Sequence, residues 1–314
     1  MSTSAAPGDA GDGHDPADPV HDSGVDDDGA DSAVVSTGPG RLVLVGTPIG
    51  NLDDLTPRAA AAFGAAAVVA CEDTRRTGRL LSHLGVRAPK LVRLDDHTEL
   101  RVSPSLVERV RTGELVAVAS DAGMPGLSDP GARLVAMTVD AGLRVEVVPG
   151  PFAAAVGLVG SGLLSDSGRF CFEGFLPRKG PHRAARLAEL AGEQRTVVLY
   201  EAPHRLARTL ADLRDVLGPD RRVALCRELT KLHEQTWGGT LQDALDHCDV
   251  QTPRGEYVVV LDGAPAPEGA DDAELLAALD AELAAGASRR DAAMAIAERF
   301  GVAPNRVKRL LTGR

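Results

Sequence analysis

The sequence predicts an α/β protein made of two α/β domains and a small helical unit at the C-terminal end. Between Arg41 and Val148, short and continuously apolar segments alternate with helix patterns, which is typical of a parallel sheet covered on both faces. Beyond Pro151 the apolar segments 223–227 and 235–237 follow each other without a helix between them, which indicates a mixed sheet in a second domain. Residues 288–311 have the apolar spacing of two short helices, similar to a helix-turn-helix.

Helix caps and apolar runs predict the individual elements. Thr56 is an expected N-cap with Pro57 in the first turn, and Gly85 follows a helix that begins near Thr74. Ser128 or Asp129 is expected to cap the helix near 129–141. The predicted strands are residues 42–45, 67–70, 91–94, 115–119, 145–148, 170–172, 196–200, 223–227, 235–237 and 257–261. The other predicted helices are residues 56–63, 74–84, 100–112, 152–161, 181–191, 203–217 and 241–247.

Composition divides the chain into five parts. Residues 1–40 hold nine Asp and neither Lys nor Arg, so we expect a disordered acidic tail. We expect an N-terminal α/β domain at 41–150, a second at 151–262, a linker at 263–273 and a basic helical unit at 274–314. That unit carries seven basic and two acidic residues from Gly286 onward, and it could be either a helical cap or a nucleic-acid contact.

The net charge leaves a polyanionic partner open, whereas the cysteine spacing argues against a metal site and against disulfides. The 314-residue chain has a net charge of −11, yet residues 41–314 hold 34 Lys and Arg against 36 Asp and Glu, so a polyanionic partner is not disfavoured. The four cysteines are widely spaced, and we expect no metal site and no disulfide framework. The chain has no signal-peptide pattern and no apolar run long enough to span a bilayer, so a cytoplasmic protein without membrane association is expected.

The loops that follow the first five strands point to a ligand site. Ligands of open parallel sheets bind beyond the carboxyl ends of the strands, and here these ends carry glycines and carboxylates, in 46–51, 71–75, 95–99, 120–131 and 149–151. The first loop lacks the G-x-G-x-x-G pattern, and there is no G-x-x-x-x-G-K-[ST] loop, so a dinucleotide and ATP hydrolysis are disfavoured. Residues 120–131, with three Gly, two Pro and two Asp, form the most unusual of these loops.

Several motifs resemble one known family. Ser120–Gly131 and Val148-Pro-Gly-Pro-Phe152 resemble the tetrapyrrole-methylase superfamily. Gly46-TPIGNLDDLTPRA, Cys71-EDTR, Phe172-EGFLPRKG and Tyr200-EAPHR resemble, more narrowly, the ribosomal RNA small-subunit methyltransferase I family, in order over residues 41–262. The resemblance implies two α/β domains with a deep cleft, S-adenosylmethionine in that cleft, and a homodimer. It also implies 2′-O-methylation of a cytidine ribose in the decoding region of 16S ribosomal RNA, in the small ribosomal subunit.

The resemblance assigns the cofactor loops, and the chemistry and position of other residues make them catalytic or RNA-binding candidates. The loops expected to bind the cofactor contribute Gly46, Pro48, Gly50, Asp121, Ala122, Gly123, Pro125, Ser128, Asp129, Pro130, Pro149 and Gly150. The catalytic candidates are Glu72, Asp73 and His204, although an ion pair of the two carboxylates with Arg75 or Arg76, or a helix-start histidine, would account for them equally well. The expected RNA contacts are Arg178, Lys179, Arg205, Arg306, Lys308 and Arg309.

Methyl transfer from a sulfonium to a ribose hydroxyl needs alignment, a dry site and a group that takes the proton. Paired lysines are not expected to serve, because the chain has only four lysines and just Lys179 and Lys231 lie in conspicuous motifs. Glu228 and Lys231 could simply pair with each other. Two other functions remain open: methylation of a corrin ring on the same fold, and a non-catalytic module that binds a nucleotide or RNA.

Overall fold

The computed structural model describes residues 40–87, 89–165, 167–265 and 270–312. Apart from Gly40, the predicted acidic tail lies outside the described residues, and so do residues 266–269 of the predicted linker.

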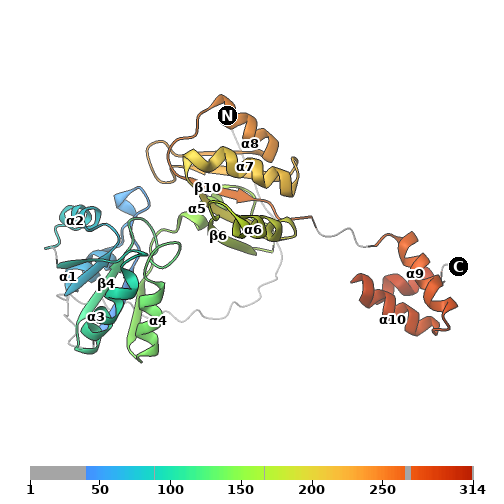
Figure 1. Ribbon diagram of the computed structural model, residues 1–314, viewed down its shortest axis with the longest axis horizontal. Coiled ribbons are helices and arrows are strands. Elements are labelled where there is room, and N and C mark those ends of the chain that lie inside the picture. Colours follow the sequence, from blue (N-terminus) through green and yellow to red (C-terminus); the bar gives the residue numbers. More distant parts are fainter. Residues whose placement is uncertain (1–39, 88, 166, 266–269, 313–314) are drawn as a thin grey trace, which may run out of the picture. The chain divides into compact units, whose positions relative to one another are not determined.

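The first sheet is entirely parallel, as predicted (Figure 1). Its strands are β1 (Arg41–Val45), β2 (Val68–Cys71), β3 (Lys90–Arg93), β4 (Leu115–Ala119) and β5 (Arg144–Val148), in the order β3-β2-β4-β1-β5. Its helices are α1 (Pro57–Ala65), α2 (Thr74–His83), α3 (Glu99–Arg111) and α4 (Ala132–Asp140), and a short 3-10 turn covers Leu52–Asp54. Alternate strand residues pack into two apolar clusters, one against α1 and α2 and one against α3 and α4, so both faces of the sheet are covered.

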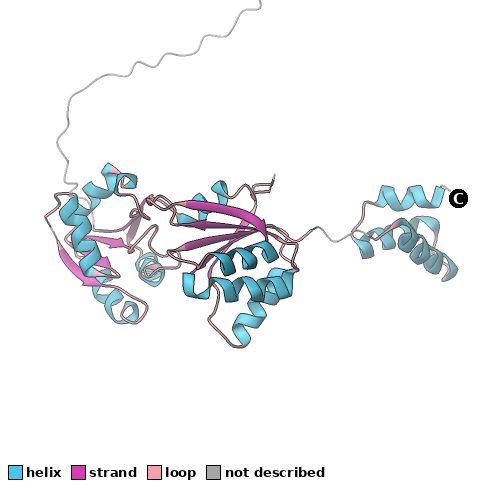
Figure 2. Cartoon of the chain, turned by 90° about the horizontal axis from the view of Figure 1, so that it is seen from above, coloured by secondary structure: helices cyan, strands magenta, loops and turns pink. Residues whose placement is uncertain are grey.

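The second sheet is mixed, which confirms the prediction from the adjacent strands. It consists of β6 (Phe170–Phe175), β7 (Thr196–Glu201), β8 (Arg222–Arg227), β9 (Gln235–Thr240) and β10 (Tyr257–Leu261), in the order β6-β7-β10-β8-β9. Only the β6–β7 pair is parallel. Leucines of α6 (Pro181–Ala191), α7 (Pro203–Leu217) and α8 (Leu241–Val250) pack on one face, and α5 (Ala153–Gly160) packs on the other. Figure 2 shows the strands of this sheet beside helices.

The C-terminal unit has three helices in its described part, where the sequence pattern predicted two. They are α9 (Asp272–Ala284), α10 (Arg289–Phe300) and α11 (Pro304–Thr312), and they share a core of their own that includes Leu275, Ile296 and Val307. The additional helix is α9, which begins with a capping box between Asp271 and Glu274.

The start of α4 differs from the prediction. Neither Ser128 nor Asp129 caps this helix, because it begins only at Ala132. Instead the Glu99 side chain, from the first turn of α3 and only 6% exposed, accepts hydrogen bonds from the backbone N–H groups of Gly131, Arg133 and Leu134 at 2.9, 3.1 and 3.4 Å. A carboxylate at a helix N-terminus is also favoured by the helix dipole. Glu99 therefore fixes the end of the 120–131 loop.

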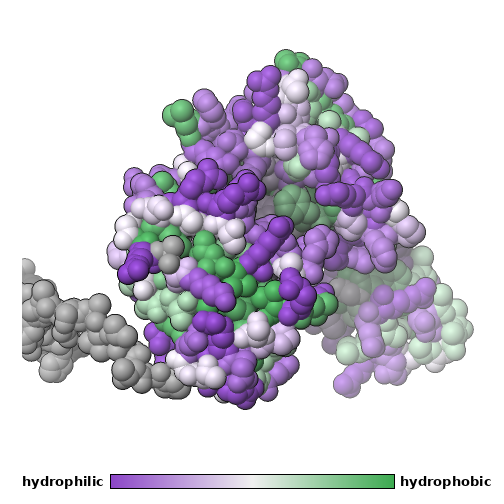
Figure 3. All heavy atoms as spheres, turned by 60° about the vertical axis from the view of Figure 1, so that its left-hand side comes forward, coloured by the Kyte–Doolittle hydropathy of each residue, from purple (hydrophilic) through white to green (hydrophobic). Residues whose placement is uncertain are grey.

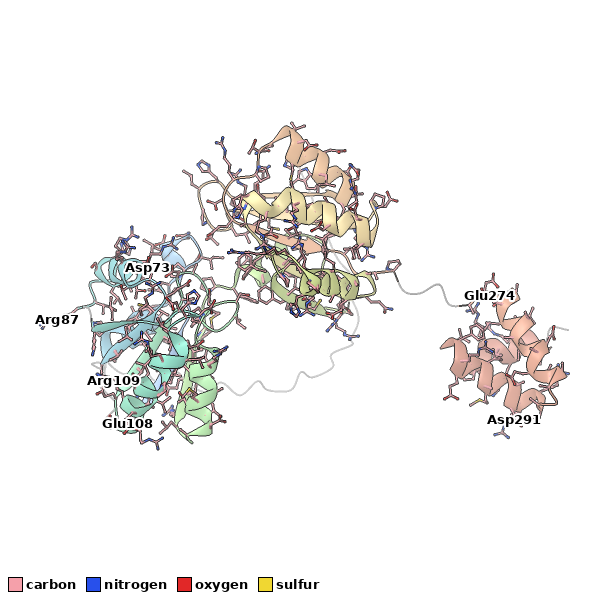
Figure 4. The ribbon with its side chains drawn as sticks, viewed as in Figure 1. Asp73, Arg87, Glu108, Arg109, Glu274 and Asp291 are labelled. Atoms are coloured by element: carbon pink, nitrogen blue, oxygen red, sulfur yellow. The ribbon has the colours of Figure 1, made fainter. Side chains whose placement is uncertain are left out.

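Glu99→Ala should lower the free energy of unfolding by about 1–3 kcal/mol, because it leaves buried N–H groups without an acceptor. Urea denaturation at pH 7 measures the change. The matched control is Glu108→Ala on the same helix (Figure 4), whose exposed pair with Arg111 should contribute less than about 0.5 kcal/mol. Equal effects of the two substitutions would show that Glu99 is not the cap.

Candidate active site

A cavity of ≈480 Å³ opens at the carboxyl ends of strands from both sheets. The first sheet contributes Glu72 after β2 and residues 121–124 and 127–129 after β4. The second sheet contributes residues 200–204 at and beyond the carboxyl end of β7, residues at the carboxyl end of β8, and residues 256–258 at the amino end of β10. The face drawn in Figure 3 is hollowed, with hydrophobic side chains inside the hollow and hydrophilic ones around it. The volume lies within the roughly 300–1,000 Å³ that is usual for small-molecule sites.

Two backbone contacts hold three loops of the first sheet together at this edge. Gly46, after β1, lies so close to Gly150, after β5, that a Cβ atom on Gly46 would stand 2.6 Å from the Gly150 Cα. Thr47 and Gly123 exchange backbone hydrogen bonds of 2.9 and 3.1 Å, which joins the loops after β1 and β4. Gly46 and Gly150 are therefore required by close packing of backbone on backbone.

The backbone around the cavity is strained. Among the described residues, the non-glycine positions with positive φ are Ser128, Glu228 and Thr230, and all three lie in loops that border the cavity. Ser128 also approaches the second sheet, since a Cβ on Gly174 of β6 would stand 2.6 Å from its Oγ. Such conformations persist only where the surroundings hold them, and they cluster at functional sites.

Three carboxylates of the first domain line the cavity and repel one another. Burial, followed by the charges of Glu72 and Asp121, raises the pKa of Asp129 to about 7. Burial and Asp121 also raise the pKa of Glu72. The negative charge of Asp121 is partly compensated, because its carboxylate pairs with Arg76 at 3.2 Å and accepts a hydrogen bond from the Asp73 N–H at 3.1 Å. At neutral pH the site can therefore hold a proton on Asp129.

The predicted catalytic residues lie in different surroundings. Glu72 and His204 both line the cavity. Asp73 is the N-cap of α2 (Figure 4) and accepts the N–H groups of Arg75 and Arg76, and the Arg75 amide lowers its pKa. That capping role accounts for Asp73, and it is not among the residues found to line the cavity in the described part of the chain.

The predicted cofactor residues fall into two groups. Asp121, Ala122, Gly123, Ser128 and Asp129 line the cavity. The remaining predicted residues shape the surrounding loops: Gly46 and Gly150 through their mutual contact, Pro48 and Gly50 in a second hollow of ≈350 Å³, and Pro125, Pro130 and Pro149 in the loops after β4 and β5.

An aromatic wall was not among the predicted site residues. Phe172 packs edge-on against Phe152 and Tyr200, with ring centroids 5.1 and 4.9 Å apart, and Phe175 lies 5.6 Å from Tyr200. The Tyr200 hydroxyl accepts the Ala154 N–H at 3.2 Å, and burial raises its pKa to about 12. The position of Phe175 and Tyr200 at the ends of β6 and β7 could have indicated the site.

A partly exposed pair of salt bridges borders another side of the cavity. Lys231 donates to Glu228 at 2.9 Å and to Glu256 at 2.7 Å, which confirms the expected Glu228–Lys231 pair. A Cβ on Gly50 would collide with Lys231, so the loop after β1 reaches this part of the second domain.

The predicted RNA contacts also differ from one another. Arg178, Lys179, Lys308 and Arg309 are exposed. Arg205 is held by Glu201 at 3.2 Å and by the carbonyl oxygen of Leu176 at 2.7 Å. Arg306 is bound to Asp272 at 2.7 Å and to the carbonyl oxygen of Ala270. The side chains of Arg205 and Arg306 are therefore engaged within the protein.

Comparison with known proteins identifies the family. The family described as Tetrapyrrole (Corrin/Porphyrin) Methylases matches residues 41–245. The chain belongs to this family. Ribosomal RNA small subunit methyltransferase I of Synechocystis sp. is 47% identical over 225 residues, which make up 72% of this methyltransferase and 80% of that protein. The protein of the same name from Pseudomonas aeruginosa is 45% identical over 270 residues, 85% of this chain and 94% of its own length.

A solved structure supports the same architecture. Uroporphyrin-III C-methyltransferase from Thermus thermophilus, complexed with S-adenosylhomocysteine, superimposes with a TM-score of 0.51 at 20% identity, over 70% of this methyltransferase and 97% of that chain. The predicted family resemblance, the fold class and the methyltransferase class are confirmed. No helix in the described ranges is long and apolar enough to cross a membrane.

Asp129→Asn should change the pH dependence of stability. The pKa of Asp129 in the folded protein lies above its ordinary value of 3.8, so its stabilising contribution is complete below that value and is lost as the pH rises through about 7. The asparagine does not ionise. The free energy of unfolding of the variant, relative to wild type, should therefore increase from pH 5 to pH 8.

Thermal and urea denaturation across this pH range measure that difference. Asp246→Asn on α8, which removes an exposed carboxylate from outside the cavity, is the matched control and should show no such trend. A difference between Asp129→Asn and wild type that stays constant with pH would show that Asp129 ionises normally.

Proposed function

We propose that this methyltransferase transfers the methyl group of S-adenosylmethionine to the 2′-hydroxyl of a cytidine ribose in the decoding region of 16S ribosomal RNA. The observation that carries the proposal is the cavity shared by the loops of the first sheet and the aromatic and basic segments of the second. The names of the relatives at 45–47% identity support ribosomal RNA as the acceptor. Action on the ribosome implies a cytoplasmic location, and we propose that the chain works as a homodimer.

The residues of the cavity fit this cofactor, which when bound supplies a methyl group already activated on a positively charged sulfonium. A cation is favoured by the carboxylates of Glu72 and Asp121 and by aromatic ring faces such as those of Tyr200 and Phe152. Gly123 lines the cavity, where its backbone lets a ligand approach closely, and the contact of Gly46 with Gly150 holds the neighbouring loops together. We assign cofactor binding to these loops, together with Ser128 and Asp129.

The protein's own contribution is alignment, exclusion of water and control of one proton. The aromatic wall and the apolar residues Ile49, Leu127 and Leu229 exclude water from the cavity. As the ribose oxygen forms its bond to the methyl carbon, it must lose its hydrogen. Of the predicted catalytic residues, Glu72 and His204 line the cavity. Asp129, predicted as a cofactor residue, lines it too, and we assign it the role of proton acceptor because its pKa lies near 7.

On the acceptor side, the exposed Arg178 and Lys179 follow β6 and supply positive charge beside the cavity. Lys308 and Arg309 of α11 add an exposed basic surface on the C-terminal unit. Phosphate contacts of this kind position an RNA without reading its sequence.

The proposal is tested by incubating the protein with 30S subunits and S-adenosylmethionine labelled in its methyl group. Nuclease digestion of the 16S RNA to nucleosides should give labelled 2′-O-methylcytidine from one position. Uroporphyrinogen III, offered as a competing acceptor, should remain unlabelled. Label on the tetrapyrrole, or on a base in place of a ribose, would overturn the proposed acceptor.

Asp121→Asn and Ser128→Ala should each weaken the binding of S-adenosylhomocysteine by about 1–3 kcal/mol, because each removes a hydrogen-bonding or charged group that lines the cavity. Isothermal titration calorimetry measures the affinity, and NAD serves as a ligand that should not bind. Asp53→Asn, on the exposed 3-10 turn, is the control. Unchanged affinity in a folded Asp121→Asn protein would remove Asp121 from the cofactor site.

A further inference from the structure

A hollow of ≈280 Å³ next to the main cavity is lined by four arginines, one histidine and one threonine. Its lining consists of Arg178, Arg183, His204, Arg205, Arg208 and Thr209. Arg178 comes from the loop after β6, Arg183 from α6 and the others from the first two turns of α7. Within the described chain, no Asp or Glu appears in this lining.

Two of the arginines are fixed and form the frame of the hollow. Arg183 is only 5% exposed and donates to Asp212 at 2.8 Å, to the carbonyl oxygen of Pro177 at 2.9 Å and to Thr209 at 3.1 Å. Arg205 donates to the carbonyl oxygen of Leu176 and pairs with the buried Glu201. Both arginines therefore tie the loop after β6 to helix α7, and a carboxylate balances the charge of each.

The other two arginines have no such partner. Arg178 and Arg208 are exposed, and across residues 40–312, as far as they are described, neither has a carboxylate oxygen within 4.0 Å. Two exposed guanidinium groups without a carboxylate partner thus line one hollow, and this combination favours an anion with several acceptor oxygens.

The hollow adjoins the active-site cavity. His204 lines both spaces, and Glu201, which anchors Arg205, lines the cavity next to Tyr200. The side chain of His204 therefore lies between an anion bound in the hollow and the cavity to which we assign methyl transfer. An RNA chain has a phosphate beside every ribose, so a ribose in the cavity would bring a backbone phosphate close to the hollow.

We propose that this hollow, which we call the arginine hollow, binds a backbone phosphate of the RNA next to the methylated nucleotide. Arg178 and Arg208 contact the phosphate oxygens. Arg183 and Arg205 are positioning residues that hold the loop and the helix in place. The inference rests on the proposed RNA acceptor, and it adds Arg208 to the acceptor surface, a residue that the sequence motifs did not single out.

The test is the salt dependence of binding to 30S subunits. Each phosphate contact contributes roughly 0.7–0.9 to the slope of log K against log salt concentration. The double variant Arg178→Gln/Arg208→Gln should flatten this slope by about 0.7–0.9. It should also raise the KM for 30S subunits about tenfold, as expected for the loss of one charged contact of about 1.4 kcal/mol. Its affinity for S-adenosylhomocysteine should not change.

Two further variants separate a phosphate site from a general effect of charge. Arg101→Gln/Arg133→Gln removes two exposed arginines from α3 and α4, outside all three hollows, and should keep the wild-type slope and KM. Arg178→Lys/Arg208→Lys keeps the charge but loses the bidentate geometry, so it should restore the slope and only part of the affinity. Melting temperatures verify that each variant is folded.

The outcomes separate the two proposals, because the binding titration does not require methyl transfer. A double glutamine variant whose slope and KM match those of the Arg101/Arg133 control would overturn the arginine hollow as a phosphate site. Wild-type protein that binds 30S subunits with a slope steeper than that of the double glutamine variant, but transfers no label, would overturn the proposed function and leave the phosphate site standing.

Discussion

The close contact between the loops after β1, β4 and β5 is the constraint on which the rest of the site depends. Gly46 and Gly150 touch through their backbones, and Thr47 pairs with Gly123, so the carboxyl edge of the first sheet forms one continuous rim. A side chain at either glycine would separate the loops. Since parallel strands deliver all their following loops to the same edge, three loops distant in sequence can meet there.

The electrostatics of the cavity follow from that rim. Burial, followed by the charges of Glu72 and Asp121, raises the pKa of Asp129, and burial and Asp121 raise the pKa of Glu72, which follows β2. Such an arrangement is unfavourable for an empty fold and favourable for a cationic ligand. Other contacts offset the stability lost through this repulsion. They are the Glu99 cap at the end of the 120–131 loop, the leucine cores of the two sheets, and the Lys231 ion pairs on the opposite side of the cavity.

Much of this architecture could be predicted from the sequence, because it is encoded locally. The strands 115–119 and 257–261 were predicted with their observed bounds, since continuous apolar runs between turn residues leave little choice. The glycines and carboxylates of the rim were predicted by their place after strands. Helix α9 was missed because its Ala- and Leu-rich sequence has no distinct polar face and follows a segment that resembles a linker.

What could not be predicted depends on contacts between residues far apart in the chain. Glu99 caps a helix that begins 33 residues later, and no local pattern announces such a contact. The engagement of Arg205 by Glu201 and Leu176, and of Arg306 by Asp272, likewise appears only when the elements are packed. The aromatic wall comes from the second domain, and its distance from the rim is a property of the fold.

A crystal structure of the protein with S-adenosylhomocysteine tests the central claim most directly, that the cavity between the rim and the aromatic wall is the methyl-donor site. The account predicts ligand density in this cavity, in contact with the 121–129 loop and beside Gly46 and Gly150. Density in the hollow lined by Pro48 and Arg79, or in the arginine hollow, would contradict it.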